Sequence, residues 1–100
     1  MSAGATWSAV AIHPGDSVAV VLRDVAAGER VAVRIDGRIR EVTAIDAIAL
    51  GHKIATVAIA KGASVLKYGA AIALATSDIA EGQHVHVHNV ASNRAKKAVP

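Results

Sequence analysis

The sequence contains no cysteine and no phenylalanine, and it has one tryptophan and one tyrosine among its 100 residues. Without cysteine, the chain can form neither a disulfide framework nor a thiolate metal site. Hydrophobic residues make up 53% of the chain but aromatic residues only 2%. We therefore expect one small domain whose core is built from valine, isoleucine, leucine and alanine, without a pocket walled by aromatic rings.

Long hydrophobic runs are also missing from the sequence. No apolar run approaches the length of about 20 residues that a membrane-spanning helix needs. The N-terminal stretch "MSAGATWSAVAIH" has no basic region of the kind that begins a signal peptide. We therefore expect a soluble, cytoplasmic domain with no membrane partner.

The net charge of +3 comes from one end of the chain, because Arg94, Lys96 and Lys97 lie in its last seven residues. Without these three residues, basic and acidic side chains balance. Aromatic residues for stacking on bases are absent from the basic stretch. We therefore expect no nucleic-acid partner, and we divide the chain into an extension (1–10), a domain (11–92) and a basic tail (93–100).

Most of the chain consists of apolar runs of strand length. Residues 17–22 are typical of a buried strand, and residues 29–45 of a hairpin. Residues 69–75 predict a strand, although their alanine content would also suit a helix. Residues 84–90 predict the last strand. Residues 44–59 are ambiguous, with a helical turn or a strand in the first half and a β-branched strand in the second.

Two kinds of tight turn are expected. Pro14–Gly15 suits the centre of a type II turn, because proline fixes φ and glycine accepts a positive φ. The hairpin turns around Asp36–Gly37, where a two-residue loop would place Arg38 and Arg40 on the Val33/Ile35 face. We favour a three-residue loop, which would pair Ile35 with Ile39.

The pattern [VI]-A-x-G-x-x-V occurs three times, at residues 25–31, 59–65 and 79–85. Each copy suggests a buried anchor, a tight turn at a glycine and a new strand that begins three residues later. The spacing of the copies is unequal, which argues against a solenoid. These corners and the short apolar runs predict a compact, mostly β domain with short helical turns.

Three of the five histidines, His84, His86 and His88, occupy every second position of "HVHVHNV". In a strand they would share one face, while Val85 and Val87 would face the core and the Asn89 amide would tie down a loop. The outer imidazoles would then lie about 13 Å apart, so a regular strand would supply only two ligands to one ion. A solvated edge strand would show the same alternation. The residues themselves leave open a metal ligand, a proton shuttle or a binder of anions.

Two shorter motifs carry related side chains. "GHK" (51–53) places an imidazole beside an ammonium group, and "KYG" (67–69) places a lysine beside the single tyrosine. Each alone is also compatible with an exposed turn or a strand end. Together with the histidines, they supply groups that bind carboxylates and move protons. His13 has no assigned role.

The order of these motifs resembles the small-subunit or N-terminal domain of the altronate/galactarate dehydratase family, and the small subunit of sulfolactate sulfo-lyase is similar. The resemblance covers about residues 11–92 and is carried by G-H-K, K-Y-G and G-x-H-V-H-x-H-N at 82–89. It implies a single β-clip domain of the SAF type. It also implies lyase chemistry, the loss of water or sulfite from a hydroxylated sugar acid, with a divalent metal such as iron.

The same resemblance implies a separate large catalytic subunit, so we expect a hydro-lyase subunit that is inactive alone; homo-oligomerisation stays open. The residues implied for catalysis are His52, Lys53, Lys67 and His86. Those implied for substrate binding are Lys67, Tyr68 and Asn89. Those implied for the metal are His84, His86 and His88. The alternative is a non-catalytic SAF-type module that binds a ligand or joins subunits.

Overall fold

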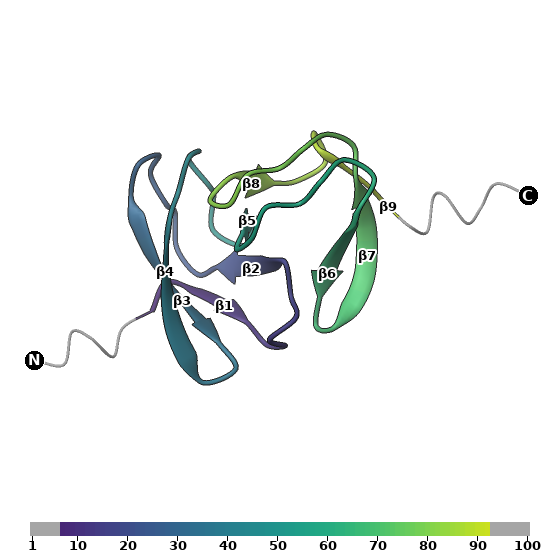
Figure 1. The fold of residues 1–100 in the computed structure, drawn as a ribbon. Coiled ribbons are helices and arrows are strands. Elements are labelled where there is room, and N and C mark those ends of the chain that lie inside the picture. Colours follow the sequence, from purple (N-terminus) through teal and green to yellow (C-terminus); the bar gives the residue numbers. More distant parts are fainter. Residues whose placement is uncertain (1–6, 93–100) are drawn as a thin grey trace, which may run out of the picture.

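The structure is a computed structural model that describes residues 7–92, so the basic tail expected at 93–100 lies outside the described residues. The described part consists of strands and turns, as the mostly β prediction requires, and contains no helix, including none that could cross a membrane. Figure 1 shows the strands: β1 (Ala9–Ala11), β2 (Val18–Val21), β3 (Arg30–Ile35), β4 (Arg38–Thr43), β5 (Lys53–Ala55), β6 (Ser64–Lys67), β7 (Ala70–Ala75), β8 (His84–Val85) and β9 (Val90–Ser92).

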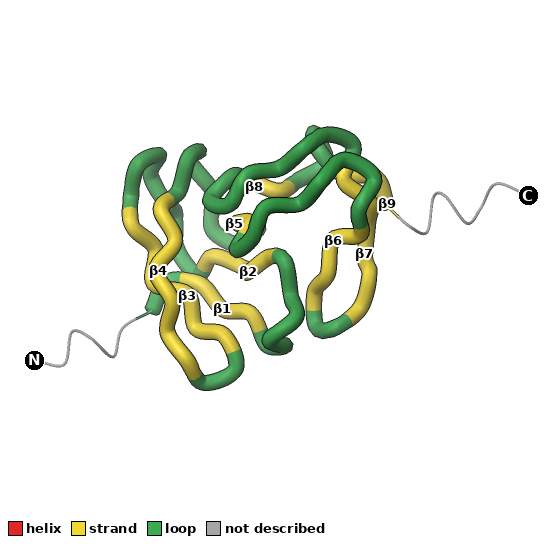
Figure 2. The backbone as a smooth tube through the Cα atoms, viewed as in Figure 1, coloured by secondary structure: helices red, strands yellow, loops and turns green. Residues whose placement is uncertain are grey.

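The strands form two sheets, with the orders β4-β3-β1-β2-β5-β8 and β6-β7-β9 (Figure 2). All pairs are antiparallel except β1 with β3. Each sheet has its own buried aliphatic cluster, and β2 contributes to both, because Val21 packs in the first and Val18 in the second. Strand β2 therefore joins the two halves of the domain.

The hairpin β3–β4 turns through two residues, so the prediction of a three-residue loop is wrong. Ile35 pairs with Arg38, and Arg34 pairs with Ile39. Asp36 and Gly37 both have positive φ, 47° and 81°, as a type I′ turn requires, and such a turn matches the twist of the flanking strands. Arg40 therefore lies opposite Val33, on the face that the two-residue alternative gave it.

The three glycine corners form as predicted. Gly28, Gly62 and Gly82 have φ of 86°, 86° and 89°, and a new strand begins two residues after each glycine, one residue earlier than expected. The Pro14–Gly15 turn also forms, closed by the hydrogen bond from Asp16 N–H to the carbonyl of His13 (3.0 Å). Its expected type is wrong, however, because Gly15 lacks the positive φ of a type II turn. Proline at this position suits a type I turn equally well.

The Gly82 corner packs directly on the end of β4. The backbone N–H of Ile45 donates to the carbonyl of Gly82 (2.8 Å), and Gly82 N–H donates to the carbonyl of Ala55 (2.8 Å). A Cβ atom on Gly82 would lie 2.0 Å from the carbonyl oxygen of Thr43. This close approach of two backbones anchors the start of β8 between the two halves of the domain.

A histidine and lysine cluster as the candidate functional site

Strand pairing brings the G-H-K motif to the histidine-rich stretch. Strands β5 and β8 are antiparallel neighbours, with Lys53 opposite Val85 and Ile54 opposite His84. His52 lies just before β5 in a tight turn that Gly51 makes possible with a φ of 85°. The pairing therefore places His52 next to the imidazoles of β8 and the turn that follows it.

Three imidazoles lie in contact. The rings of His52 and His86 stack with centroids 4.1 Å apart, and those of His52 and His84 are 5.1 Å apart. His52 Nδ1 and His84 Nε2 are at hydrogen-bonding distance, 2.9 Å. The candidate ligand nitrogens of His52, His84 and His86 all lie within 4.8 Å of one another.

This donor set suits a divalent metal ion. Imidazole nitrogens bind such ions at about 2.0–2.1 Å, so ligand nitrogens on one ion lie about 3–4 Å apart. The three half-buried side chains would have to rotate out of their stacked arrangement to point one nitrogen each at a single ion. Three protein ligands also leave coordination positions open, as catalytic sites require.

The stretch that carries these histidines is not a continuous strand. Strand β8 ends at Val85, which is 2% exposed as expected, and residues 86–89 form a turn. Val87 is 80% exposed, so its predicted burial and the prediction of a single row of histidines on one strand face are wrong. The turn folds His88 back toward His84, with ring centroids 5.2 Å apart.

Asn89 is the physical reason for the turn. Its side chain is almost completely buried, and its Oδ1 accepts from His86 N–H (3.0 Å) while its Nδ2 donates to the carbonyl of His84 (2.8 Å). The expectation that this amide ties down a loop is therefore confirmed. Because backbone groups occupy both ends of its amide, Asn89 stabilises the turn by hydrogen bonds to the backbone of His84 and His86.

The two lysines extend the cluster toward the K-Y-G motif. Burial lowers the pKa of Lys53, and the positive charge of Lys67 lowers it further. The Lys67 ammonium lies 4.8 Å from the centre of the Tyr68 ring. Val65 and Ile72, from the hairpin that carries K-Y-G, line one hollow with Lys53 and His86. The three sequence motifs therefore lie at one region of the surface.

The pKa values of two histidines are lowered. For His84, burial is the largest cause, followed by the neighbouring histidines, and Asp46 opposes the shift. For His86, burial comes first, then His52, Lys53 and His88. Both effects favour neutral imidazole, which is the form that binds metal ions.

Sequence reasoning missed Asp46, whose Oδ2 accepts a hydrogen bond from His84 N–H at 3.0 Å. This carboxylate lies 38 residues before His84 in the chain, in the stretch that was ambiguous between a helical turn and a strand. No local motif marks it, so only the pairing of distant segments reveals its place beside the cluster.

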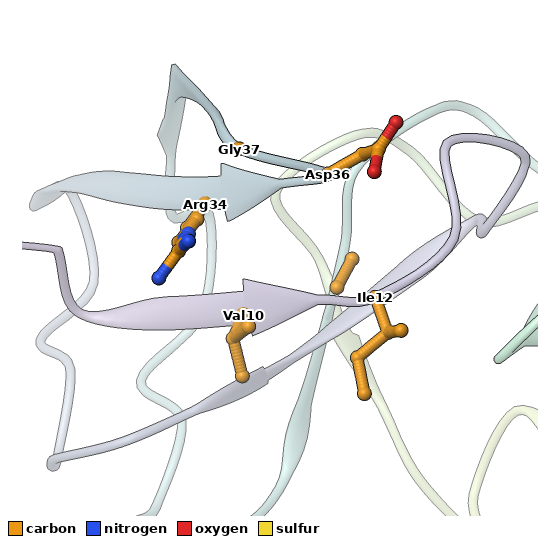
Figure 3. A pocket seen from close by; sticks show the side chains of 6 residues that line it. Val10, Ile12, Arg34, Asp36 and Gly37 are labelled. Carbon is orange, nitrogen blue, oxygen red and sulfur yellow. The ribbon is translucent and has the colours of Figure 1, made fainter.

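Two surface hollows can be compared. One, of about 180 Å³, borders the cluster and is lined by Lys53 and His86 together with apolar side chains that include Ile72 and Val87. The other, of about 320 Å³, lies at the tip of β3 (Figure 3). There Arg34 and Asp36 point in different directions (Figure 3), so the two charged side chains of this hollow do not converge. His52 and His84 line a third hollow, together with Asp24.

Comparison with known proteins agrees with these motifs. The profile of the altronate/galactarate dehydratase SAF domain matches residues 7–93. The altronate dehydratase of Escherichia coli is 49% identical over 84 residues, and that of Bacillus subtilis is 43% identical over 86 residues. These matches cover 84% and 86% of this chain but only 16% of each relative.

A third relative has a length close to that of this chain. It is the (2R)-sulfolactate sulfo-lyase subunit alpha of Chromohalobacter salexigens, 36% identical over 87 residues, with 83% of this chain and 93% of the relative covered. The chain therefore spans about a sixth of the altronate dehydratases and nearly all of a protein that is named as a subunit.

Proposed function

This chain belongs to the altronate/galactarate dehydratase SAF-domain family, and from that membership we propose that it is the small subunit of a lyase. The enzyme would remove water, or sulfite, from a hydroxylated sugar acid or a similar hydroxy acid, and a separate large subunit would supply the rest of the active site. The observation that carries the proposal is that G-H-K and H-V-H-V-H-N form one histidine cluster, beside a hollow that the hairpin carrying K-Y-G also lines.

In this proposal His52, His84 and His86 hold a divalent metal ion, with iron as the family resemblance suggests. Their ligand nitrogens form the close group, whereas His88 lies beside it, near His84. His52 therefore replaces His88 in the ligand set expected from the sequence. The bound ion would act as a Lewis acid toward substrate oxygen atoms.

The remaining groups suit an elimination next to a carboxylate. Lys53 and Lys67 would attract the substrate carboxylate and stabilise the negative charge that develops when the α-proton leaves. Tyr68 lies beside Lys67 and would add a hydrogen bond. His88 is the imidazole of this region outside the ligand group, and we assign it the transfer of a proton. His88 would take the α-proton, and the C–H electrons would form the new double bond as the Cβ–O bond breaks. The protonated His88 would then return the proton to the departing hydroxyl, which leaves as water.

The surface around the cluster supports the need for a partner. Val87 is 80% exposed at the tip of the turn that carries His86 and His88, and Ile72 is also exposed beside it. Closing an active site expels water and strengthens the electrostatic interactions inside it. A large subunit that covers Val87 and Ile72 would close the cluster against solvent.

The test compares His86→Ala with His88→Ala in the reconstituted complex with the large subunit. We expect His86→Ala to lower metal affinity by more than the roughly 10–100-fold that the loss of an outer-shell partner costs, and to abolish turnover. His88→Ala should keep the metal, measured by elemental analysis, and lose turnover alone. Equal metal content in wild type and His86→Ala would contradict the ligand assignment.

A second measurement tests the subunit assignment. The isolated chain should show no lyase activity, and adding the large subunit should restore it. Full activity of the isolated chain would contradict the proposed role. Association with the large subunit together with unchanged turnover in both histidine variants would favour the non-catalytic binding module.

A further inference from the structure

Tyr68 adopts a backbone conformation that tyrosine rarely adopts. Its φ is +55°, and the only other described non-glycine residue with positive φ is Asp36. A bulky side chain in this region crowds the backbone, so such a conformation persists only where neighbouring contacts hold it. Contacts from neighbouring residues must therefore hold the turn formed by Lys67, Tyr68 and Gly69.

A buried carboxylate holds this turn. Asp16 is 5% exposed, and its Oδ1 accepts from Gly69 N–H (2.8 Å) while its Oδ2 accepts from His13 N–H (3.2 Å). Burial alone would raise the pKa of Asp16, but the backbone amides of Gly69, Tyr68 and His13 outweigh it and lower the pKa. Asp16 is therefore a charged anchor whose partners are mainly backbone amides.

The residues next to Asp16 hold the same hairpin. The backbone N–H of Ser17 donates to the carbonyl of Leu66 (3.0 Å), and Ser17 Oγ accepts from Leu66 N–H (2.7 Å). The ring of His13 lies so close to Gly69 that a Cβ atom there would be 2.9 Å from it. Residues 13–17 therefore clamp the end of the β6–β7 hairpin.

This clamp matters because of what the turn carries. The Lys67 ammonium lies over the Tyr68 ring. After burial, the positive charge of Lys67 is the second cause that lowers the pKa of Lys53 at the histidine cluster. A change in the turn would therefore move the two side chains that extend the cationic cluster. Asp16 itself contacts backbone amides and lies behind the turn.

We propose that Asp16 is a positioning residue, whose buried carboxylate holds the Lys67–Tyr68–Gly69 turn so that Lys67 and Tyr68 meet the substrate carboxylate. The inference rests on the proposed function, because it assumes that the carboxylate binds at these side chains. Its structural part, the dependence of the turn on Asp16, concerns this chain alone.

The experiment uses Asp16→Asn in the complex with the large subunit. Asparagine keeps the shape of the side chain but has one acceptor oxygen in place of two. We expect KM for the hydroxy acid to rise about tenfold or more with a smaller change in kcat, because substrate binding is lost more than chemistry. Metal content should stay unchanged, since the metal ligands lie on other segments.

Asp78→Asn is the matched control. Asp78 also accepts a backbone hydrogen bond, from Lys61 N–H at 2.8 Å, but it does not hold the K-Y-G turn. The Asp78→Asn substitution should leave KM for the hydroxy acid unchanged. A wild-type KM in a folded Asp16→Asn complex would overturn the inference.

A double-mutant cycle covers the case in which Asp16→Asn folds poorly. Tyr68→Gly removes the steric demand of the turn, so Asp16→Asn should have a smaller effect on both stability and KM in that background. Strictly additive effects would overturn the inference.

Nuclear magnetic resonance of the isolated chain separates this inference from the proposed function. The ring of Tyr68 should shift the Lys67 ε-methylene signals upfield in wild type, and Asp16→Asn should return them toward random-coil values. Unchanged signals would overturn the positioning role. A wild-type complex without lyase activity would instead reject the proposed function and leave this result standing.

Discussion

The β3–β4 and β6–β7 hairpins turn through the same pair of backbone conformations and hold them by different means. Asp36–Gly37 has φ of 47° and 81°, and Tyr68–Gly69 has φ of 55° and 74°. Both turns are exposed, but a Cβ atom on Gly37 would meet no atom within 4 Å. In the second turn, a Cβ atom on Gly69 would lie 2.9 Å from the ring of His13, and Gly69 N–H donates a hydrogen bond to Asp16.

The difference shows that local residue preference is enough to form one of these turns but not the other. Aspartate followed by glycine favours a type I′ turn by itself, and this turn lies at the tip of a hairpin. Tyrosine does not favour a positive φ, and its turn carries side chains of the candidate site. Backbone strain held by surrounding contacts is a recurring property of functional sites.

The largest expected effect extends this contrast to the glycine corners. Gly82→Ala should destabilise the domain by about 4 kcal/mol or more, because the new Cβ would meet the carbonyl of Thr43 as well as an unfavourable φ. Gly62→Ala has open space around it and should cost about 1–2 kcal/mol. Denaturant unfolding of both variants measures the difference, and equal losses would refute the tertiary role of the Gly82 corner.

The second effect compares the glycines of the two hairpin turns. Gly37→Ala should cost about 1–2 kcal/mol from the positive φ alone. Gly69→Ala should cost about 2–3 kcal/mol, because its Cβ would also displace the ring of His13. Denaturant unfolding again provides the measurement. A smaller loss for Gly69→Ala than for Gly37→Ala would show that the clamp adds nothing.

The third effect is a pH dependence. Because the folded pKa of Asp16 is lowered, its stabilisation is present above the unfolded value of about 3.9 and is lost as the pH falls through the folded pKa. Asp16→Asn should therefore lose about 1–2 kcal/mol at pH 7, and the gap to wild type should narrow in acid. Urea unfolding between about pH 7 and 2 measures this, with Asp36→Asn as the control. A gap that stays constant in acid would contradict the role of the charge.

The smallest expected loss of stability comes from placing tyrosine in the β3–β4 turn, as in the Tyr68–Gly69 turn. Asp36→Tyr places the strained residue in a turn that has no support, and it should cost about 1 kcal/mol. Asp36→Asn, which tolerates a positive φ, should change stability by less than about 0.5 kcal/mol. Thermal unfolding distinguishes the two, since about 1 kcal/mol corresponds to about 4–8 °C in Tm. A neutral Asp36→Tyr would mean that the Tyr-Gly turn needs no anchor.

Much of the fold was readable in the sequence because it depends on local pattern. The alternation of apolar and polar residues predicted the hairpin at residues 29–45, which forms as β3 and β4. The glycine of each repeated corner adopts the expected positive φ. The three motifs also identified a family to which the chain belongs. The predicted three-residue loop at Asp36–Gly37 is wrong, because aspartate followed by glycine favours the two-residue type I′ turn, which pairs Ile35 with Arg38.

The sequence by itself determined most of the strands, the glycine corners and the types of side chain in the candidate site. Only the tertiary structure decided which of them meet. His52 joins His84 through the pairing of β5 with β8, 32 residues apart in the chain, and the buried amide of Asn89 bends residues 86–89 into a turn and exposes Val87. A period of two residues reports the local backbone direction, whereas the meeting of distant segments depends on long-range hydrogen bonds and burial that no single stretch contains.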